Sequence, residues 1–185
     1  MRSVVPSMRV ALVLLALAAP LRAFAADYTD STALDALFAE LKSAPDAGAA
    51  SAIEQQIWKA WLTPNVPELA ADMDKASAAL GAGDVQTAMD TYDAVVNKWP
   101  DYAEGWNRRA TLEFEIGDNT ASLADIAKVL AIEPRHFGAL SGRMMIELQQ
   151  GKRPDALKDM IAALAIDPYL DGKELFPELM NSINI

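Results

Sequence analysis

The sequence predicts an all-α protein in which antiparallel helix pairs stack into a solenoid. Three glycines recur at a spacing of 34 residues, and three prolines recur at the same spacing further along. A period of this length, with glycine in its middle and proline at its end, is typical of stacked helix-turn-helix units. No stretch alternates apolar and polar residues in the manner of a strand. The recurring residues are Gly83, Gly117 and Gly151, with Pro100, Pro134 and Pro168.

Residues 1–25 predict a secretory signal peptide. They contain the basic residues Arg2 and Arg9, no acidic residue, an apolar run over 10–19, and the sequence Ala-Phe-Ala at 23–25. Small residues placed in this way form a cleavage site. The apolar run is short, since a spanning helix needs about 20 residues; an uncleaved membrane anchor is the alternative. The signal is of a bacterial type, and we therefore expect a periplasmic protein.

The charge and the lack of cysteine narrow the classes of partner and anchor that this protein could have. Without residues 1–25, the chain has 13 basic and 26 acidic residues. This excess of negative charge argues against binding to nucleic acid or to an anionic membrane. It fits a basic partner or, more simply, a solvated acidic surface. The chain contains no cysteine, so its helices must be held by packing without disulfides, and no thiol is present to carry a lipid anchor.

Residues 26–66 predict an N-terminal helical hairpin. Its first helix begins near Ser31 or Thr32, either of which can cap it. Pro45 and Gly48 break the chain before the second helix. The hairpin lacks glycine and proline in register with the later period, so we expect a degenerate repeat or a cap. Its apolar stripes consist of Leu34, Leu37, Phe38 and Leu41, then Ile53, Ile57, Trp58, Trp61 and Leu62.

Residues 67–170 predict three helix pairs, and residues 171–185 predict a C-terminal capping helix. The expected helices cover about 67–80, 85–98, 102–116, 119–133, 136–150 and 154–167. Each first helix ends at a glycine that can adopt a positive φ, and each second helix stops before a proline. Pro177 lies inside the last segment, so that helix is expected to be kinked or to begin late.

Further positions recur with the same period, and together they resemble the tetratricopeptide repeat family. Small residues recur on the second helices (Ala88, Ser122 and Ala156) and allow close packing. The matching units are 69–102, 103–136 and 137–170. Trp106 alone matches the family's aromatic at position 4, and its usual tyrosine at position 11 is replaced by alanine or glutamate. The run 104–110 is also similar to exported bacterial members. The resemblance implies a right-handed superhelix.

The resemblance also implies a peptide-binding groove on the concave face, lined by the first helix of each pair. Met73, Phe114 and Met145 would form an apolar floor, and Asn107 would bond a peptide backbone. The alternative is that the apolar residues only pack against the capping helix. Met73 and Ser77 replace the lysine and asparagine with which some members clamp a carboxylate, which excludes that mode. The candidate groove residues are Met73, Ser77, Leu80, Glu104, Asn107, Arg108, Thr111, Phe114, Ser141, Met145 and Leu148.

Four arginines stand out in an acidic chain: Arg108, Arg109, Arg135 and Arg143. They could form a basic patch for an acidic group. Pairing within the chain is the favoured interpretation, because acidic residues are plentiful and Glu104, Glu113, Glu133 and Glu147 lie nearby in sequence.

No motif for nucleotide binding or hydrolysis occurs. His136 is the only histidine, and without cysteine it predicts a residue at a helix start rather than a zinc ligand or a catalyst. We therefore expect a protein without cofactor, metal or enzymatic activity that binds an unidentified protein of the cell envelope, without nucleic acid or stable membrane insertion. The alternatives are a self-assembling structural module and, less favoured, a small-molecule binder or enzyme that uses the groove.

Overall fold

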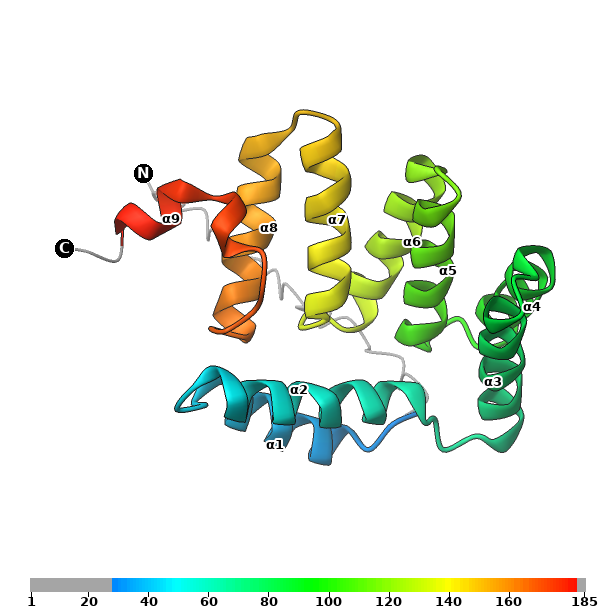
Figure 1. Cartoon of the computed structure of the whole chain (residues 1–185). Coiled ribbons are helices and arrows are strands. Elements are labelled where there is room, and N and C mark those ends of the chain that lie inside the picture. The colour runs from blue at the N-terminus through cyan, green and yellow to red at the C-terminus, as the bar shows by residue number, and fades with distance from the viewer. Residues whose placement is uncertain (1–27, 183–185) are drawn as a thin grey trace, which may run out of the picture.

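A computed structural model describes residues 28–182, with side chains as far as Leu179. The predicted signal peptide and the last three residues lie outside the described residues. The described chain is helical, without strands (Figure 1), which confirms the predicted fold class. Its elements are α1 (Ser31–Lys42), α2 (Ala47–Leu62), α3 (Pro67–Gly81), α4 (Val85–Lys98), α5 (Ala103–Glu115), α6 (Asn119–Ile132), α7 (Phe137–Gln149), α8 (Arg153–Ile166), the short 3-10 helix η1 (Lys173–Leu175) and α9 (Pro177–Ser182).

Three antiparallel pairs, α3–α4, α5–α6 and α7–α8, stand side by side in a row (Figure 1). The second helix of each pair contacts the first helix of the next, α4 with α5 and α6 with α7, and α5 also contacts α7. Each pair therefore buries its apolar stripes against its own partner and its neighbour, as in a repeat solenoid.

The turns inside the pairs follow the predicted chemistry. Gly83, Gly117 and Gly151 have φ of 76°, 87° and 72°, the left-handed region that side chains disfavour. The next residue caps the following helix in two of the pairs: the Asp84 carboxylate accepts the Thr87 N–H at 3.0 Å, and Asp118 makes the same contact one repeat later. The glycine reversal and the aspartate cap together end one helix and start the next.

The expected cap of the first helix was wrong. Neither Ser31 nor Thr32 fills that position; Asp30 is the N-cap of α1, and its carboxylate accepts the Ala33 N–H at 3.0 Å. An ionised acceptor at a helix N-terminus also interacts favourably with the helix dipole, which a hydroxyl does not.

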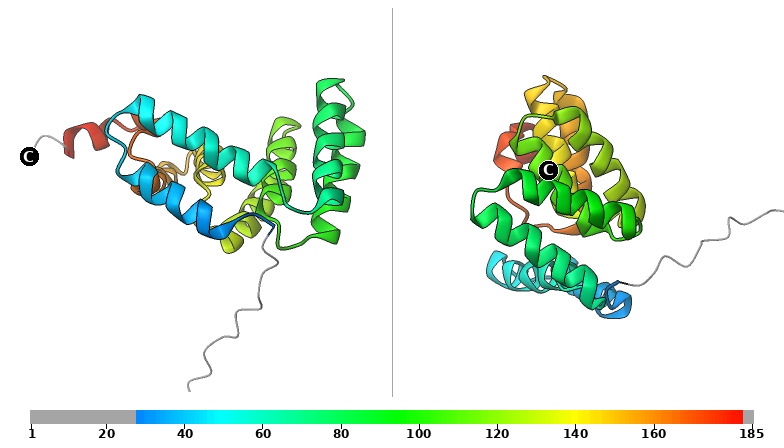
Figure 2. Two further views of the ribbon diagram at one scale, coloured as in Figure 1. Left: turned by 90° about the horizontal axis from the view of Figure 1, so that it is seen from below. Right: turned by 90° about the vertical axis from the view of Figure 1, so that its right-hand side faces the viewer.

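The hairpin α1–α2 does not extend the row as another repeat. It lies across one end of the helix pairs, as the views in Figures 1 and 2 agree. Its apolar core includes Leu41, Ile57 and Trp61, and this core continues into Phe137 at the start of α7 and Tyr169 after α8. The hairpin thus ties the first part of the chain to the third repeat.

The C-terminal segment covers the far end of the row. Phe176 is fully buried and packs with Met144 and Met160, and Leu179 packs against the same cluster. The expected helix begins late, at Pro177, after a turn of 3-10 helix. Proline suits this first helical position because it has no N–H that would need a partner.

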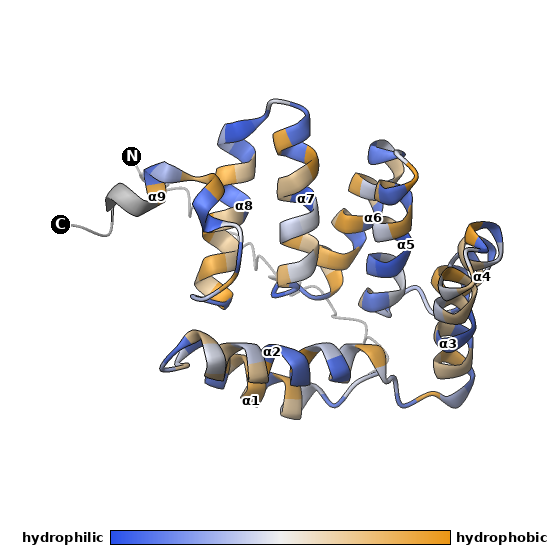
Figure 3. Ribbon diagram, in the orientation of Figure 1, coloured by the Kyte–Doolittle hydropathy of each residue, from blue (hydrophilic) through white to orange (hydrophobic). Residues whose placement is uncertain are grey.

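No helix between residues 28 and 182 is both long and apolar enough to span a membrane. Figure 3 shows polar and apolar residues mixed along α2, α7 and α8.

Candidate functional site

A small pocket opens between the second and third repeats. It has a volume of about 100 Å³ and lies among α5, α6 and α7. From α5 it is lined by Asn107, Ala110, Thr111 and Phe114, and Ile126 of α6 lies opposite. Small and apolar residues make up most of the lining, and Asn107, Thr111 and Ser122 are its polar members.

Two glycines on one face of α7 leave room for this pocket. Gly138 and Gly142 both line it, and they lie one helical turn apart. A Cβ built on Gly142 would sit 3.6 Å from the Ile126 Cδ1, an ordinary contact, whereas one on Gly138 would come within 2.6 Å of the Trp58 Cη2. Glycine at 138 is therefore required for α2 to approach, and glycine at 142 only keeps the space open.

Asn107 is the polar group that the surroundings orient. It is 8% exposed, and its Nδ2 donates to the Glu104 Oε2 at 2.9 Å. Because a carboxylate only accepts, the Asn107 Oδ1 points elsewhere. The hydroxyl of Thr111 donates to the Asn107 main-chain oxygen at 2.9 Å, so it is already engaged as a donor. The Asn107 Oδ1 is therefore an acceptor held in place beside the pocket.

Glu104 is the buried carboxylate that fixes the Asn107 side chain. It is 1% exposed, and besides Asn107 it accepts the Arg108 Nε at 2.7 Å and faces the His136 Nε2 at 3.1 Å. A buried carboxylate is stable only when such donors satisfy it. The His136 contact joins α5 to the start of α7, and the other two fix the Glu104 carboxylate within α5.

His136 links the start of α7 to Glu104 of α5 and to Trp61 of α2. Its Nδ1 accepts the Ala139 N–H at 3.1 Å, which makes it the N-cap of α7 and places its proton on Nε2, where it donates to Glu104. Its ring stacks on Trp61 at 4.0 Å, with 4° between the planes. The prediction of a residue at a helix start is confirmed.

The structure brings only part of the expected groove together. Asn107, Thr111 and Phe114 line the pocket. Met73 is 3% exposed inside the core of the first repeat, where Leu80 also packs, so the expected apolar floor of Met73, Phe114 and Met145 does not form.

The remaining expected residues lie outside the pocket lining. Ser77 and Met145 are exposed and Ser141 is half-buried. Glu104 accepts a hydrogen bond from Asn107, and Arg108 pairs with Glu104. Leu148 packs with Phe176 and Leu179. The alternative, that Met73, Phe114 and Met145 pack against the capping segment, is not seen either, because none of the three belongs to the cluster around Phe176. That segment, as far as it is described, does not line the pocket.

Several lining residues were not expected from the sequence: Ala110, Ser122, Ile126, Ala139 and Gly142. One signal could have pointed to the pocket. Gly142 lies in the interior of α7, where glycine costs about 0.5–1 kcal/mol relative to alanine, and such a cost indicates a position that is kept free of a side chain.

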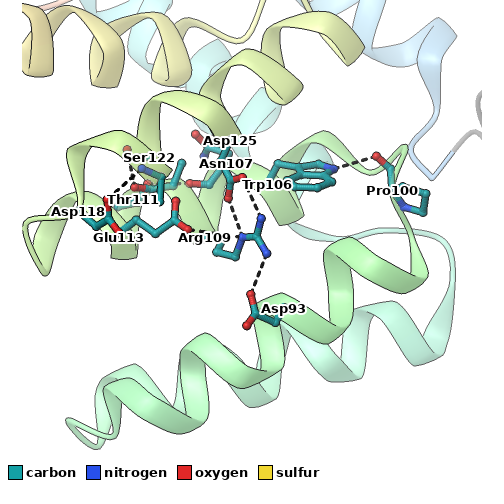
Figure 4. A network of polar contacts seen from close by, with 12 residues as sticks. Asp93, Pro100, Trp106, Asn107, Arg109, Thr111, Glu113, Asp118, Ser122 and Asp125 are labelled. Carbon is teal, nitrogen blue, oxygen red and sulfur yellow. Dashed lines mark hydrogen bonds and ion pairs between the residues drawn. The ribbon is translucent and has the colours of Figure 1, made fainter.

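The four arginines pair within the chain. Figure 4 shows Arg109 between two helices: its Nε and Nη2 donate to Asp125 at 2.6 and 2.9 Å, and its Nη1 donates to Asp93 of the preceding repeat at 2.7 Å. Arg143, 34 residues later, makes the same bidentate contact with Asp159. Arg108 pairs with Glu104, and Arg135 pairs with Glu133 and Asp35. The expected glutamates Glu104, Glu133 and Glu113 do pair with Arg108, Arg135 and Arg109, the last at 3.8 Å. Aspartates of the second helices, which were not expected, add the shorter contacts of Arg109 and Arg143.

A glutamate accompanies each of these Arg–Asp pairs. Burial and the neighbouring Asp125 raise the pKa of Glu113 to about 7, and burial beside Asp159 raises the pKa of Glu147. Both occupy the position where the family usually has tyrosine. Glu113 is 8% exposed and its Oε2 has no hydrogen-bond partner among the described residues.

In the described part of the chain, no three histidine, cysteine or carboxylate side chains are placed to hold a metal ion. Pockets that enclose a cofactor or a drug-sized ligand measure roughly 300–1,000 Å³, well above the volume found between α5 and α7.

Comparison with known proteins gives relatives of one kind. The chain is 41% identical over 138 residues to a TPR repeat-containing protein of Rhizobium etli. This alignment covers 75% of this chain and 65% of that protein. It is 33% identical over 89 residues to the mouse DnaJ homolog subfamily C member 3, and 31% identical over 104 residues to the human one. These alignments cover 48% and 56% of this chain, but only 18% and 21% of the relatives. No family model matches the chain. The 34-residue period, the stacked helix pairs and the Rhizobium relative agree: the chain belongs to the tetratricopeptide repeat family.

Proposed function

We propose that this protein captures an extended peptide segment of a partner, with one aliphatic side chain of that segment seated between α5, α6 and α7. Proteins of this repeat family mediate protein–protein interactions in general, and the pocket is the observation that carries the finer proposal. Its volume of about 100 Å³ is on the scale of one branched side chain. Burying such a side chain contributes about 1.5–3 kcal/mol.

The polar edge of the pocket supports an extended peptide. The Asn107 Oδ1 is free to accept a main-chain N–H, because Glu104 engages the Nδ2. A preoriented acceptor loses little side-chain entropy on binding. No residue in this proposal acts as a nucleophile or a general base, in keeping with a family that is typically not enzymatic.

The setting that we propose is the periplasm, with a partner in the cell envelope. The signal-peptide pattern of residues 1–25 supports it. Cell fractionation, followed by N-terminal sequencing of the exported form, tests this part alone: a mature chain that begins at Ala26 is expected, and an intact N-terminus on a membrane-bound form would contradict it.

Site-specific photocrosslinking in the native cell tests the binding site. A photoreactive residue at Thr111, on the pocket lining, should crosslink to one or two envelope proteins, and the matched control at Ala131, exposed on α6, should not. Gly142→Leu in the Thr111-labelled protein fills the pocket and should remove the crosslink. The same products from both positions, or products made only of this chain, would refute the groove; the second result would favour self-assembly.

A further inference from the structure

Arg108 of α5 is an arginine whose guanidinium group is only partly used. Its Nε donates to the Glu104 Oε1 at 2.7 Å. Neither its Nη1 nor its Nη2 has an acceptor in the part of the chain that the structure describes. The side chain is 34% exposed. A partly exposed arginine with two unengaged amino groups can bind a further acceptor.

Two other arginines show how this protein uses the whole group. The Nε and Nη2 of Arg109 hold Asp125 of α6, and its Nη1 holds Asp93 of α4 at 2.7 Å. Arg135 likewise joins two carboxylates, one at the end of α6 and one on α1. The planar guanidinium permits both contacts at once. Arg108 has the first carboxylate of such an arrangement and lacks the second.

The unused half of Arg108 lies beside the pocket. The Glu104 carboxylate accepts both the Arg108 Nε, at 2.7 Å, and the Asn107 Nδ2, at 2.9 Å. Because the two oxygens of a carboxylate are about 2.2 Å apart, these two nitrogens lie within about 8 Å of each other. Arg108 also lies one turn before Thr111 on the same face of α5, and Thr111 lines the pocket.

An extended peptide has a spacing that matches this arrangement. Its successive side chains point to opposite sides, so residues two apart point to the same side, roughly 7 Å from each other. With one aliphatic side chain in the pocket beside Asn107, the side chain two residues away therefore reaches the Nη1 and Nη2 of Arg108.

The open face of α5 indicates what that side chain is. Arg108 is half-buried on this face, and Thr111 and Glu115 follow it at successive turns, both exposed. A carboxylate is attracted to Arg108 and repelled by Glu115. Glu104 does not exhaust Arg108, since its carboxylate is also satisfied by Asn107 and His136. The Arg108 side of the pocket therefore suits an acidic group.

We propose that Arg108 binds an acidic side chain of the partner, two residues away from the aliphatic side chain that fills the pocket. This inference rests on the peptide binding proposed above and adds the chemistry of the partner. The partner segment is then an extended stretch in which one residue separates an aspartate or glutamate from an aliphatic residue. The acidic group is a side chain within the segment, so a free C-terminus is not required.

Selection from a displayed library of short random peptides tests the pattern. The peptides are fused through their C-termini, so that no terminal carboxylate is present, and are selected on the purified protein. The enriched sequences should pair an aliphatic residue with an acidic one two positions away. On Arg108→Gln the aliphatic preference should remain and the acidic preference should disappear. Lys128→Gln is the matched control, because it removes one positive charge from an exposed position on α6, outside the pocket lining; it should keep both preferences.

A second measurement changes the peptide and leaves the protein unaltered, so it holds even if Arg108→Gln fails to fold. A selected peptide is synthesised with an amidated C-terminus and labelled for fluorescence anisotropy. Replacing its aspartate by asparagine should weaken binding about fivefold at low salt, and the difference should shrink in 1 M salt. In Arg108→Gln the two peptides should bind equally, since the coupling belongs to this pair.

The outcomes separate this inference from the pocket itself. Aliphatic enrichment without an acidic residue at the stated spacing, or equal affinity of the aspartate and asparagine peptides, would overturn the role of Arg108 and leave the pocket standing. An acidic preference that persists in Arg108→Gln, or binding that needs a free C-terminus, would overturn it as well. No enrichment at all, or enrichment unchanged in Gly142→Leu, would refute the pocket and this inference together.

Discussion

Replacing each of the two pocket glycines by alanine should change stability in opposite directions. Gly142 lies in the interior of α7, where alanine is favoured over glycine by about 1 kcal/mol, whereas Gly138 is the second residue of the helix, where this gain is smaller. The space that the new methyl group meets also differs between the two positions.

At Gly142 the methyl would sit 3.6 Å from the Ile126 Cδ1, an ordinary contact. We expect Gly142→Ala to stabilise the protein by about 1 kcal/mol. At Gly138 it would lie 2.6 Å from the Trp58 Cη2 and 2.9 Å from its Cζ2. Trp58 sits among Trp61, His136 and Phe137, so the ring cannot move freely, and we expect a net loss of about 1–3 kcal/mol from overpacking.

Urea unfolding followed by circular dichroism measures both changes. The midpoint should rise for Gly142→Ala and fall for Gly138→Ala, with an unchanged slope if the unfolded state is unaffected. Hydrogen exchange in α2 should rise only in the second variant, because the clash pushes the hairpin away. Similar stabilisation by both substitutions would refute the packing of α2 on α7 described above.

Three further changes follow from single contacts. Glu113→Gln should flatten the fall in stability between about pH 4.5 and 7, since a carboxyl whose pKa is raised in the folded state destabilises the fold as the pH rises through that window; the difference is at most about 3 kcal/mol, and equal pH slopes in urea titrations would contradict it. Ala127→Asp places a carboxylate one period after Asp93, toward Arg143, and should add about 0.5 kcal/mol that disappears in 1 M salt; a gain that survives salt would have another origin. Trp61→Ala should cost about 3–5 kcal/mol, because the ring is 3% exposed and stacked; thermal unfolding checks it, and a loss below about 1 kcal/mol would show that the hairpin is weakly docked.

The repeat could be read from the sequence because its signals are local. A glycine that needs a positive φ and a proline that cannot continue a helix act within a few residues, so Gly117 and Pro134 fix the ends of their helices whatever surrounds them. His136 was placed correctly for the same reason. The cap at Asp30 was missed because three adjacent polar residues can all serve, and the competition among them is decided by geometry.

The pocket depended on contacts that spacing does not reveal. Met73 occupies a position that faces the groove in the family pattern, yet it is buried in the first repeat. The pocket lies where Gly142 of α7 faces Ile126 of α6, and a residue without a side chain leaves no apolar signal to detect in the sequence.

By itself, the sequence determined the helices, their ends and their pairing in a row, because these follow from backbone preferences and from apolar residues at a fixed period. Only the tertiary structure decided where the hairpin lies. That placement joins Asp35 to Arg135, 100 residues apart, and stacks Trp61 on His136. Such contacts depend on surfaces that exist only after the repeats have packed, and the pocket wall at Gly138 likewise came into view only with the fold.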